Sequence, residues 1–314
     1  MSVGVEQMKG SLLGVLAGDR VGSRTEGFTP AVIRDRHGNE DALAVIKPGR
    51  HGAATEMTAA VAESLLRFPE FDGDDMARSL ATGAERGRGY GAGTWSAIER
   101  LREGVPWREA AVGRAGRSSF GNGAATRIAP VGLLYGFDVE ALRWVAEEAA
   151  AVTHQQALGA EGAALHAVAV ALAAGSAGRR LSPAGFLLSV GREASLREYR
   201  VRYEEAARMT ERTVDQRRVI DKLGNGENAL GAVVTAAYCF ACASASFAVA
   251  VARAAALGGS AAALASMTGA ISGAYLGAAH VPMLWLEGDG EVEVVRERLE
   301  AAAAGLVGAA KRFA

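Results

Sequence analysis

The stretch Leu257-Gly258-Gly259-Ser260-Ala261-Ala262-Ala263-Leu264 places a glycine turn directly before an alanine-rich segment that continues to Leu276. No Asp, Glu, Lys or Arg occurs from Ala254 to Leu286, nor from Asn228 to Ala252. Length alone would allow both segments to span a membrane. Both, however, consist mostly of Ala, Ser and Gly, with few Leu, Ile or Phe. We therefore interpret them as buried helices of a helical bundle.

Apolar residues recur at helical spacing on both sides of these segments, whereas β-branched runs are short and prolines are few. Pro130 interrupts one such pattern and predicts a kink or a restart there. Because apolar residues recur at helical spacing from one end of the chain to the other, we predict an all-α fold with one compact multi-helix domain over residues 1–314. The predicted helices are Gly10–Ala17, Thr55–Phe68, Asp72–Ala84, Thr94–Arg102, Gly123–Tyr135, Asp138–Ala151, Gly159–Ala174, Ser182–Val190, Ser195–Thr210, Gly226–Ala241, Ser246–Leu257, Ala263–Leu276 and Val292–Arg312.

The charges are balanced, with 34 Lys and Arg against 35 Asp and Glu, so no global field favours nucleic acid or acidic lipid. Cys239 and Cys242 lie in an apolar segment without the strand-turn-helix context of a redox motif, which favours two buried thiols in a reducing cytosol. The first residues do not have the pattern of a signal peptide. We expect a cytoplasmic protein that binds neither nucleic acid nor membrane; a protein partner remains unknown.

A second stretch, Pro48-Gly49-Arg50-His51-Gly52-Ala53-Ala54-Thr55-Glu56-Met57, also runs from a tight turn into an Ala-rich helix. Both stretches look like metal-site motifs from which the carboxylates have been removed. The four residues most exposed to a cation at these turns carry no carboxylate.

Other candidate site residues lie at helix junctions. Asp19 and Glu26 are two carboxylates seven residues apart; Asp19 could accept N–H bonds from the following turn, and Glu26 could face a cleft. Asn122 lies between Gly121 and Gly123 at a helix start, where free N–H groups suit a phosphate or a sugar hydroxyl. An ordinary Asn-capped helix explains the same pattern.

His154 joins two predicted helices, and it is either a ligand contact, a general base, or a cap or surface residue. His51 adjoins the second stretch and could reach the same cavity. The glycine-rich run from Gly87 to Gly93 resembles a dinucleotide fingerprint only superficially, because no strand precedes it. Its bare backbone still marks a place where a ligand could approach closely.

Taken together, these segments resemble the ADP-ribosylglycohydrolase family, which includes dinitrogenase reductase-activating glycohydrolase, the ADP-ribosylhydrolases and the J1 crystallins. Five collinear segments carry the resemblance over nearly the whole chain: Gly10 to Glu26, Pro48 to Met57, Gly121 to Gly132, Thr153 to Ala163 and Leu257 to Gly277. In the family, the second and fifth of these contain TDDT and DTDT, whose side chains hold two Mg²⁺ ions. Here they read Gly52-Ala53-Ala54-Thr55 and Ser260-Ala261-Ala262-Ala263.

The resemblance implies an ADP-ribosyl hydrolase, but Mg²⁺ needs oxygen ligands that alanine cannot supply. We therefore expect no metal cofactor, a lost dinuclear magnesium site, and binding of a nucleotide-sugar or ribosyl ligand without family-type hydrolysis. The candidate catalytic residues are Glu26, Asp19 and His154. The candidate ligand-binding residues are Gly121, Asn122, Gly123, Thr55, His51 and Ser260.

Two alternatives remain open. One is a metal-independent enzyme that acts on an N- or O-ribosyl substrate with Glu26 as the acid/base. The other is a structural role like that of the crystallin relatives. Whether the chain is an enzyme is therefore uncertain from its residues.

Overall fold

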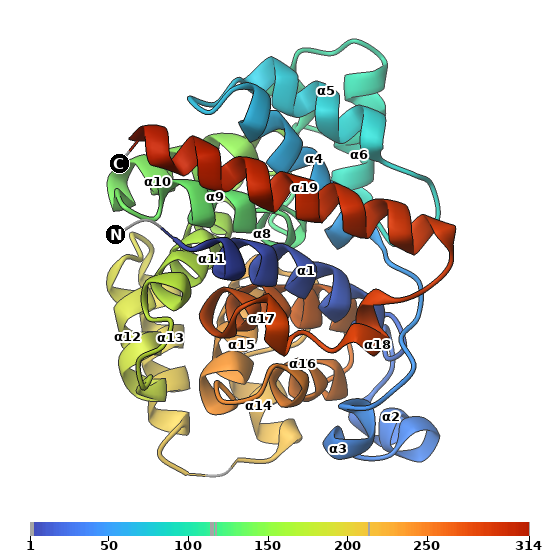
Figure 1. Cartoon of the computed structure of the whole chain (residues 1–314), viewed down its shortest axis with the longest axis vertical. Helices are drawn as coiled ribbons and strands as arrows, with labels where there is room; N and C mark the ends of the chain where they lie inside the picture. The colour runs from blue at the N-terminus through green and yellow to red at the C-terminus, as the bar shows by residue number, and fades with distance from the viewer. Residues whose placement is uncertain (1–2, 114–115, 117, 213, 314) are drawn as a thin grey trace.

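A computed structural model describes residues 3–113, 116, 118–212 and 214–313, and in this part of the chain every regular element is a helix (Figure 1). The all-α prediction is confirmed. The helices are α1 Val5–Gly22, α2 Pro30–His37, α3 Glu40–Leu43, α4 Ala53–Arg67, α5 Gly73–Gly83, α6 Ala92–Arg102, α7 Trp107–Ala110, α8 Gly123–Thr126, α9 Ala129–Tyr135, α10 Val139–Ala151, α11 Ala157–Gly175, α12 Pro183–Arg192, α13 Arg197–Met209, α14 Gln216–Lys222, α15 Ala229–Cys242, α16 Phe247–Ala256, α17 Ala261–Leu276, the 3-10 helix η1 Ala278–His280, α18 Met283–Leu286 and α19 Gly290–Phe313.

The centre of the molecule is an antiparallel pair, α1 and α17, which pack backbone to backbone (Figure 1). Glycines recur every four residues on α1, so they share one face of the helix. A Cβ atom built on Gly14 would lie 2.1 Å from the carbonyl oxygen of Gly269, and one on Gly18 would lie 2.1 Å from that of Ala265. Only glycine allows this approach, which fixes the C-terminal end of α1 beside the N-terminal end of α17.

Longer helices cover this pair. In Figure 1, α19 runs alongside α1, and it packs on both α1 and α4. Helix α11 packs on α9, α10, α15 and α17. It has the length and hydropathy of a membrane span, but 72% of that window is buried inside the domain, as in the central helix of a globular bundle.

Some predicted boundaries were wrong. The predicted helix Gly10–Ala17 is part of the much longer α1, since the glycines that looked like breakers form its packing face. The break predicted at Pro130 is confirmed, because Pro130 is the second residue of α9, just after α8 ends. Sequence reasoning missed α2, although Thr29-Pro30 is a start signal: the Thr29 hydroxyl caps the helix and Pro30 is its first residue.

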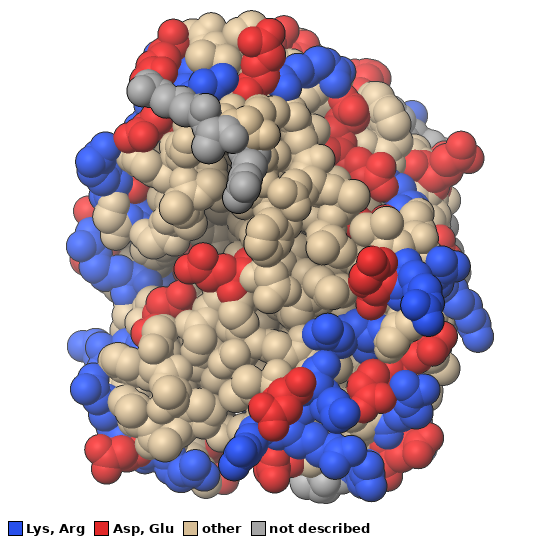
Figure 2. Space-filling view, turned by 180° about the vertical axis from the view of Figure 1, so that it is seen from behind, with Lys and Arg blue, Asp and Glu red and all other residues tan. Residues whose placement is uncertain are grey.

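Charges of both signs lie mainly around the edge of the face shown in Figure 2, and uncharged residues fill much of its centre. Cys239 is buried and Cys242 partly so, and both are free thiols on α15. Burial raises the pKa of Cys239, which makes its thiolate unfavourable. The two cysteines therefore behave as part of the helical core.

Candidate functional site

A pocket of about 380 Å³ opens where α1 ends and where α4, α8 and α17 begin. The C-terminal end of α1, the N-terminal turns of α4, α8 and α17, and two glycine-rich loops therefore meet around one cavity. Its walls are formed by Asp19, Ser23, Glu26, Arg50, His51, Gly52, Ala53, Ala54, Met57, Gly87, Arg88, Gly89, Gly91, Ala92, Gly93, Thr94, Ser119, Gly121, Asn122, Gly123, Thr126, His154, Glu227, Ser260, Ala262 and Ala263.

Asp19 lies near the end of α1 and bonds to the first turn of α4, not to its own following turn. Its Oδ2 accepts hydrogen bonds from the backbone N–H groups of Gly52 and Thr55, at 2.8 and 3.1 Å, and from the Thr55 hydroxyl at 2.6 Å. The residue is only 1% exposed. Burial raises the pKa of Asp19, and these three hydrogen bonds oppose that shift. Asp19 thus acts as the N-terminal cap of a helix far away in the sequence.

Glu26 makes the equivalent contact to the other alanine-rich helix. Its Oε2 accepts a hydrogen bond from the backbone N–H of Ala262, in the first turn of α17, at 2.7 Å. The side chain remains accessible from the pocket. The pocket walls desolvate its carboxyl group and raise its pKa, and the nearby charges of Asp19 and Glu227 add to this shift. Glu26 therefore faces the cleft with a carboxyl group that holds its proton more tightly than usual.

Asn122 does not cap the helix that it precedes, which corrects the simpler interpretation of the Gly-Asn-Gly pattern. Its side-chain Nδ2 donates to the Ser260 hydroxyl at 3.1 Å, across the pocket wall. Its backbone N–H donates to the carbonyl oxygen of Glu227 at 2.7 Å. Asn122 thereby joins the turn before α8 to the turn before α17 and leaves its amide oxygen without a hydrogen bond from a described residue.

His154 is buried behind this loop, at 1% exposure, rather than on the surface. Its Nδ1 lies 2.7 Å from the Thr153 hydroxyl, and its Nε2 forms no hydrogen bond with a described residue. Burial, helped by the buried charge of Arg127, lowers the pKa of His154 to about 3. The imidazole is therefore neutral at physiological pH. Its Nε2 can donate or accept one hydrogen bond with a ligand, depending on the tautomer.

Arg127 carries a guanidinium group with 0% exposure, and no described carboxylate pairs with it. It donates to the carbonyl oxygen of Ala149 at 2.9 Å and contacts Met57 Sδ at 3.7 Å. Burial lowers the pKa of Arg127 to about 10. The group is still charged at neutral pH and adds positive potential beneath the pocket floor.

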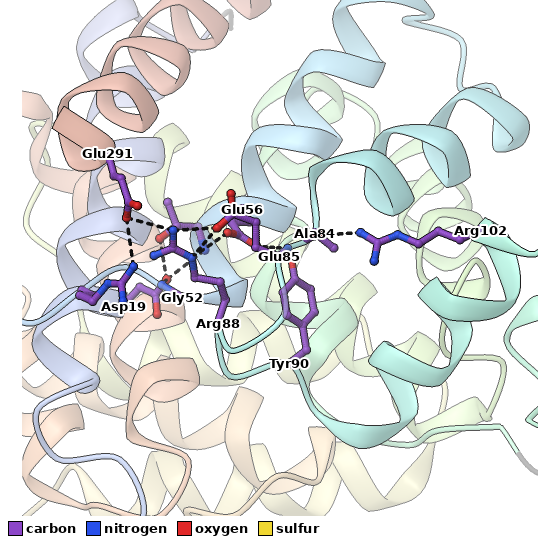
Figure 3. Close-up of polar contacts among 11 residues, drawn as sticks. Asp19, Gly52, Glu56, Ala84, Glu85, Arg88, Tyr90, Arg102 and Glu291 are labelled. Atoms are coloured by element: carbon purple, nitrogen blue, oxygen red, sulfur yellow. Dashed lines mark hydrogen bonds and ion pairs between the residues drawn. The ribbon is translucent and has the colours of Figure 1, made fainter.

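Arg88 holds the glycine-rich loop against α4 and α19 (Figure 3). Its guanidinium pairs with Glu56 at 3.2 Å, Glu85 at 2.9 Å and Glu291 at 3.0 Å, and its side chain is only 8% exposed. Its carbonyl oxygen accepts from Ala53 N–H at 2.7 Å. Tyr90 donates to Glu56 at 2.6 Å, so Glu56 belongs to this network and not to the pocket lining.

The structure brings most of the predicted site residues to one cavity. Asp19, Glu26, His51, His154, Ser260 and the Gly121–Gly123 turn all line it. Thr55 does not, because its side chain is fully buried against Asp19. Sequence reasoning missed Arg88 and Glu227 as pocket residues. The glycines around Arg88 were a usable signal for a ligand loop, whereas nothing local distinguished Glu227.

A model of the ADP-ribosylglycohydrolase family matches residues 4–313, and the chain belongs to this family. Its relatives include the mouse ADP-ribosylhydrolase ARH3, 31% identical over 94% of this chain and 91% of the relative. An uncharacterized protein from Archaeoglobus fulgidus is 32% identical over 93% of this chain and 94% of that protein. A solved structure titled as an ADP-ribosylglycohydrolase-related protein complex superposes with a TM-score of 0.70, at 26% identity and 98% coverage of both chains.

Proposed function

We propose that this member of the family binds a nucleotide-sugar or other ribosyl ligand in the pocket without the dinuclear magnesium centre that the family resemblance implies. One observation carries the proposal. The pocket wall presents the methyl groups of Ala53, Ala54, Ala262 and Ala263 at positions where the matched motifs have mostly carboxylates. Methyl groups cannot coordinate a cation.

The remaining oxygens do not fit two Mg²⁺ ions, which need near-octahedral oxygen shells that include carboxylates. Oδ2 of Asp19 already accepts three hydrogen bonds, and Oε2 of Glu26 accepts one. Ser260 offers a single hydroxyl, which accepts from Asn122. Within the described ranges, no three His, Cys, Asp or Glu side chains are grouped to hold a metal.

The same walls suit the hydroxyl groups of a ribose. The Asn122 amide oxygen, the Ser260 hydroxyl and the neutral His154 ring offer a mixture of donors and acceptors within one cavity. Alanine methyls and glycine backbone between them fit the carbon face of a sugar. The names of the vertebrate relatives, ADP-ribosylhydrolases, favour an ADP-ribosyl group as the ligand.

The test is calorimetric titration with ADP-ribose in the presence of EDTA, with ribose 5-phosphate as a shorter probe. We expect binding without metal. Replacing Asn122 by Ala should weaken it about 10-fold, since one hydrogen bond to the ligand is lost. Gln216→Ala, which removes an amide outside this pocket, is the control. Absence of binding to both probes in EDTA, with binding restored by Mg²⁺, would overturn the proposal.

A second candidate is a metal-independent ribosyl hydrolase with Glu26 as the acid/base. The observation that favours it is the desolvated Glu26 carboxyl group, because burial raises its pKa in the direction that a proton donor needs. Glu26 also faces the cavity that would hold the ligand.

A further inference from the structure

Glu227 reaches the pocket from a loop that hydrogen bonds hold on two sides. The loop connects α14 to α15. Its carbonyl groups accept from two pocket turns: Glu227 from Asn122 N–H at 2.7 Å, and Asn225 from Ser260 N–H at 2.8 Å. Just beyond it, Ala229 N–H donates to the carbonyl oxygen of Phe120 at 3.0 Å. The backbone that carries the Glu227 side chain is therefore fixed relative to the pocket.

A continuous path of hydrogen bonds and short chain segments connects Glu227 to Glu26. Glu227 binds Asn122 through its carbonyl group, and Asn122 binds the Ser260 hydroxyl through its side chain. Two residues further along the chain from Ser260, the Ala262 N–H binds the Glu26 carboxylate. Both glutamates are therefore linked to the Asn122–Ser260 pair, and both line the same cavity.

The surroundings of the two carboxyl groups differ. Glu26 is desolvated by the pocket walls and accepts a backbone hydrogen bond. Glu227 is exposed to solvent, and its carboxylate forms no hydrogen bond or ion pair with a described residue. Two carboxyl groups that line one cavity in unequal environments, one of them desolvated and one open to solvent, are the arrangement that acid and base catalysis of glycoside hydrolysis uses.

We propose that Glu26 and Glu227 form an acid and base pair for cleavage of an O-ribosyl bond without a metal. This inference rests on the proposed function, because it needs the ribosyl group to occupy this pocket. It adds a reaction and a second carboxylate to a site for which metal-free binding was argued above.

The step balances with water as the co-reactant. The bond from the anomeric carbon of the terminal ribose to the leaving oxygen breaks, and its electron pair stays on that oxygen, which takes the proton of Glu26. The oxygen of a water molecule bonds to the anomeric carbon, and one proton of that water passes to the Glu227 carboxylate. Exchange with solvent returns the proton to Glu26. The products are a free ribose hydroxyl and an alcohol.

The experiment uses two O-glycosides of ADP-ribose in EDTA, one with a 4-nitrophenyl and one with an ethyl leaving group. Nitrophenolate leaves without a proton, whereas an ethoxide leaving group needs one. We therefore expect Glu227→Gln to slow both reactions about 100-fold, and Glu26→Gln to slow mainly the ethyl glycoside. Glu204→Gln, an exposed glutamate outside the pocket, serves as the matched control.

A second variant tests whether Glu227 acts chemically. In Glu227→Gly, added azide should restore cleavage of the nitrophenyl glycoside, an effect that a purely structural role would not produce. Affinity for ADP-ribose, measured in parallel, should stay within about 3-fold of wild type. Full activity in Glu227→Gln would contradict the proposal that Glu26 and Glu227 act as an acid and base pair. Binding of ADP-ribose with no turnover by the wild type overturns the pair and leaves the proposed function intact, whereas absence of binding overturns the proposed function itself.

Discussion

The Oδ2 atom of Asp19, at the end of α1, lies 2.6 Å from the hydroxyl of Thr55, in the first turn of α4. Both residues are almost fully buried. A short bond from a hydroxyl to a carboxylate in such surroundings is stronger than one on the surface. It fixes α4 to the central helix pair at the base of the pocket.

We predict that Thr55→Val destabilises the protein by about 1–3 kcal/mol, because a buried carboxylate then loses its hydroxyl donor. Thr55→Ser keeps the hydroxyl donor and should destabilise the protein clearly less than Thr55→Val. Urea unfolding of both variants measures the difference. Equal stability of Val and Ser at this position would show that the hydroxyl bond contributes nothing.

The glycine positions at the interface between α1 and α17 should not accommodate a larger residue. We predict that Gly14→Ala costs more than about 3 kcal/mol, since its Cβ atom would lie 2.1 Å from a backbone oxygen and the helices would have to separate. Gly308→Ala on α19 is the matched control, because the added Cβ atom would meet nothing within 4 Å beyond the neighbouring backbone of its own helix. It should stabilise the protein by up to about 1 kcal/mol through helix propensity. Thermal unfolding of the two variants should give shifts of opposite sign.

Restoring acidic residues tests the interpretation of the alanine positions. We predict that Asp at positions 53, 54, 260 and 262 together creates Mg²⁺ binding that the wild type lacks, because four carboxylates then converge on one cavity. Titration calorimetry with Mg²⁺ measures it. The variant with Asn at the same four positions matches the size without the charge and should bind no metal. Equal responses from the two variants would contradict the proposed geometry.

The stability of this protein should fall in acid partly because of buried histidines. His166 is fully buried, neither ring nitrogen has a described partner, and burial lowers its pKa to about 3. On unfolding, the imidazole regains its ordinary pKa of 6.5 and takes up a proton. Unfolding is therefore favoured progressively as the pH falls from about 6.5 towards 3.

His166→Leu removes this proton uptake, so the variant should lose less stability than the wild type between pH 6.5 and 4. Unfolding free energies measured at several pH values give the two slopes. His37→Leu, at a partly exposed position on α2, controls for the loss of a histidine as such. If the unfolding free energies of the wild type and His166→Leu fell with pH at the same slope, His166 would not contribute to the loss of stability in acid.

Much of the fold could be predicted from the sequence because helical periodicity is a local property. The helices around Met57 and Leu65, and the break at Pro130, needed only nearby residues. The true length of α1 did not follow, because Gly14 and Gly18 weaken an isolated helix and are favourable only beside α17.

For the site, the sequence by itself determined that positions 53, 54, 262 and 263 carry methyl groups, and it indicated Asp19, Glu26 and Asn122 as candidates. Only the tertiary structure decided what these side chains contact. Asp19 and Glu26 each bind the N-terminal turn of a distant helix, and Glu227 joins Glu26 in one cavity. The physical reason is that the proton affinity and the role of a carboxyl group depend on desolvation and hydrogen-bond donors, which here come from segments far away in the chain.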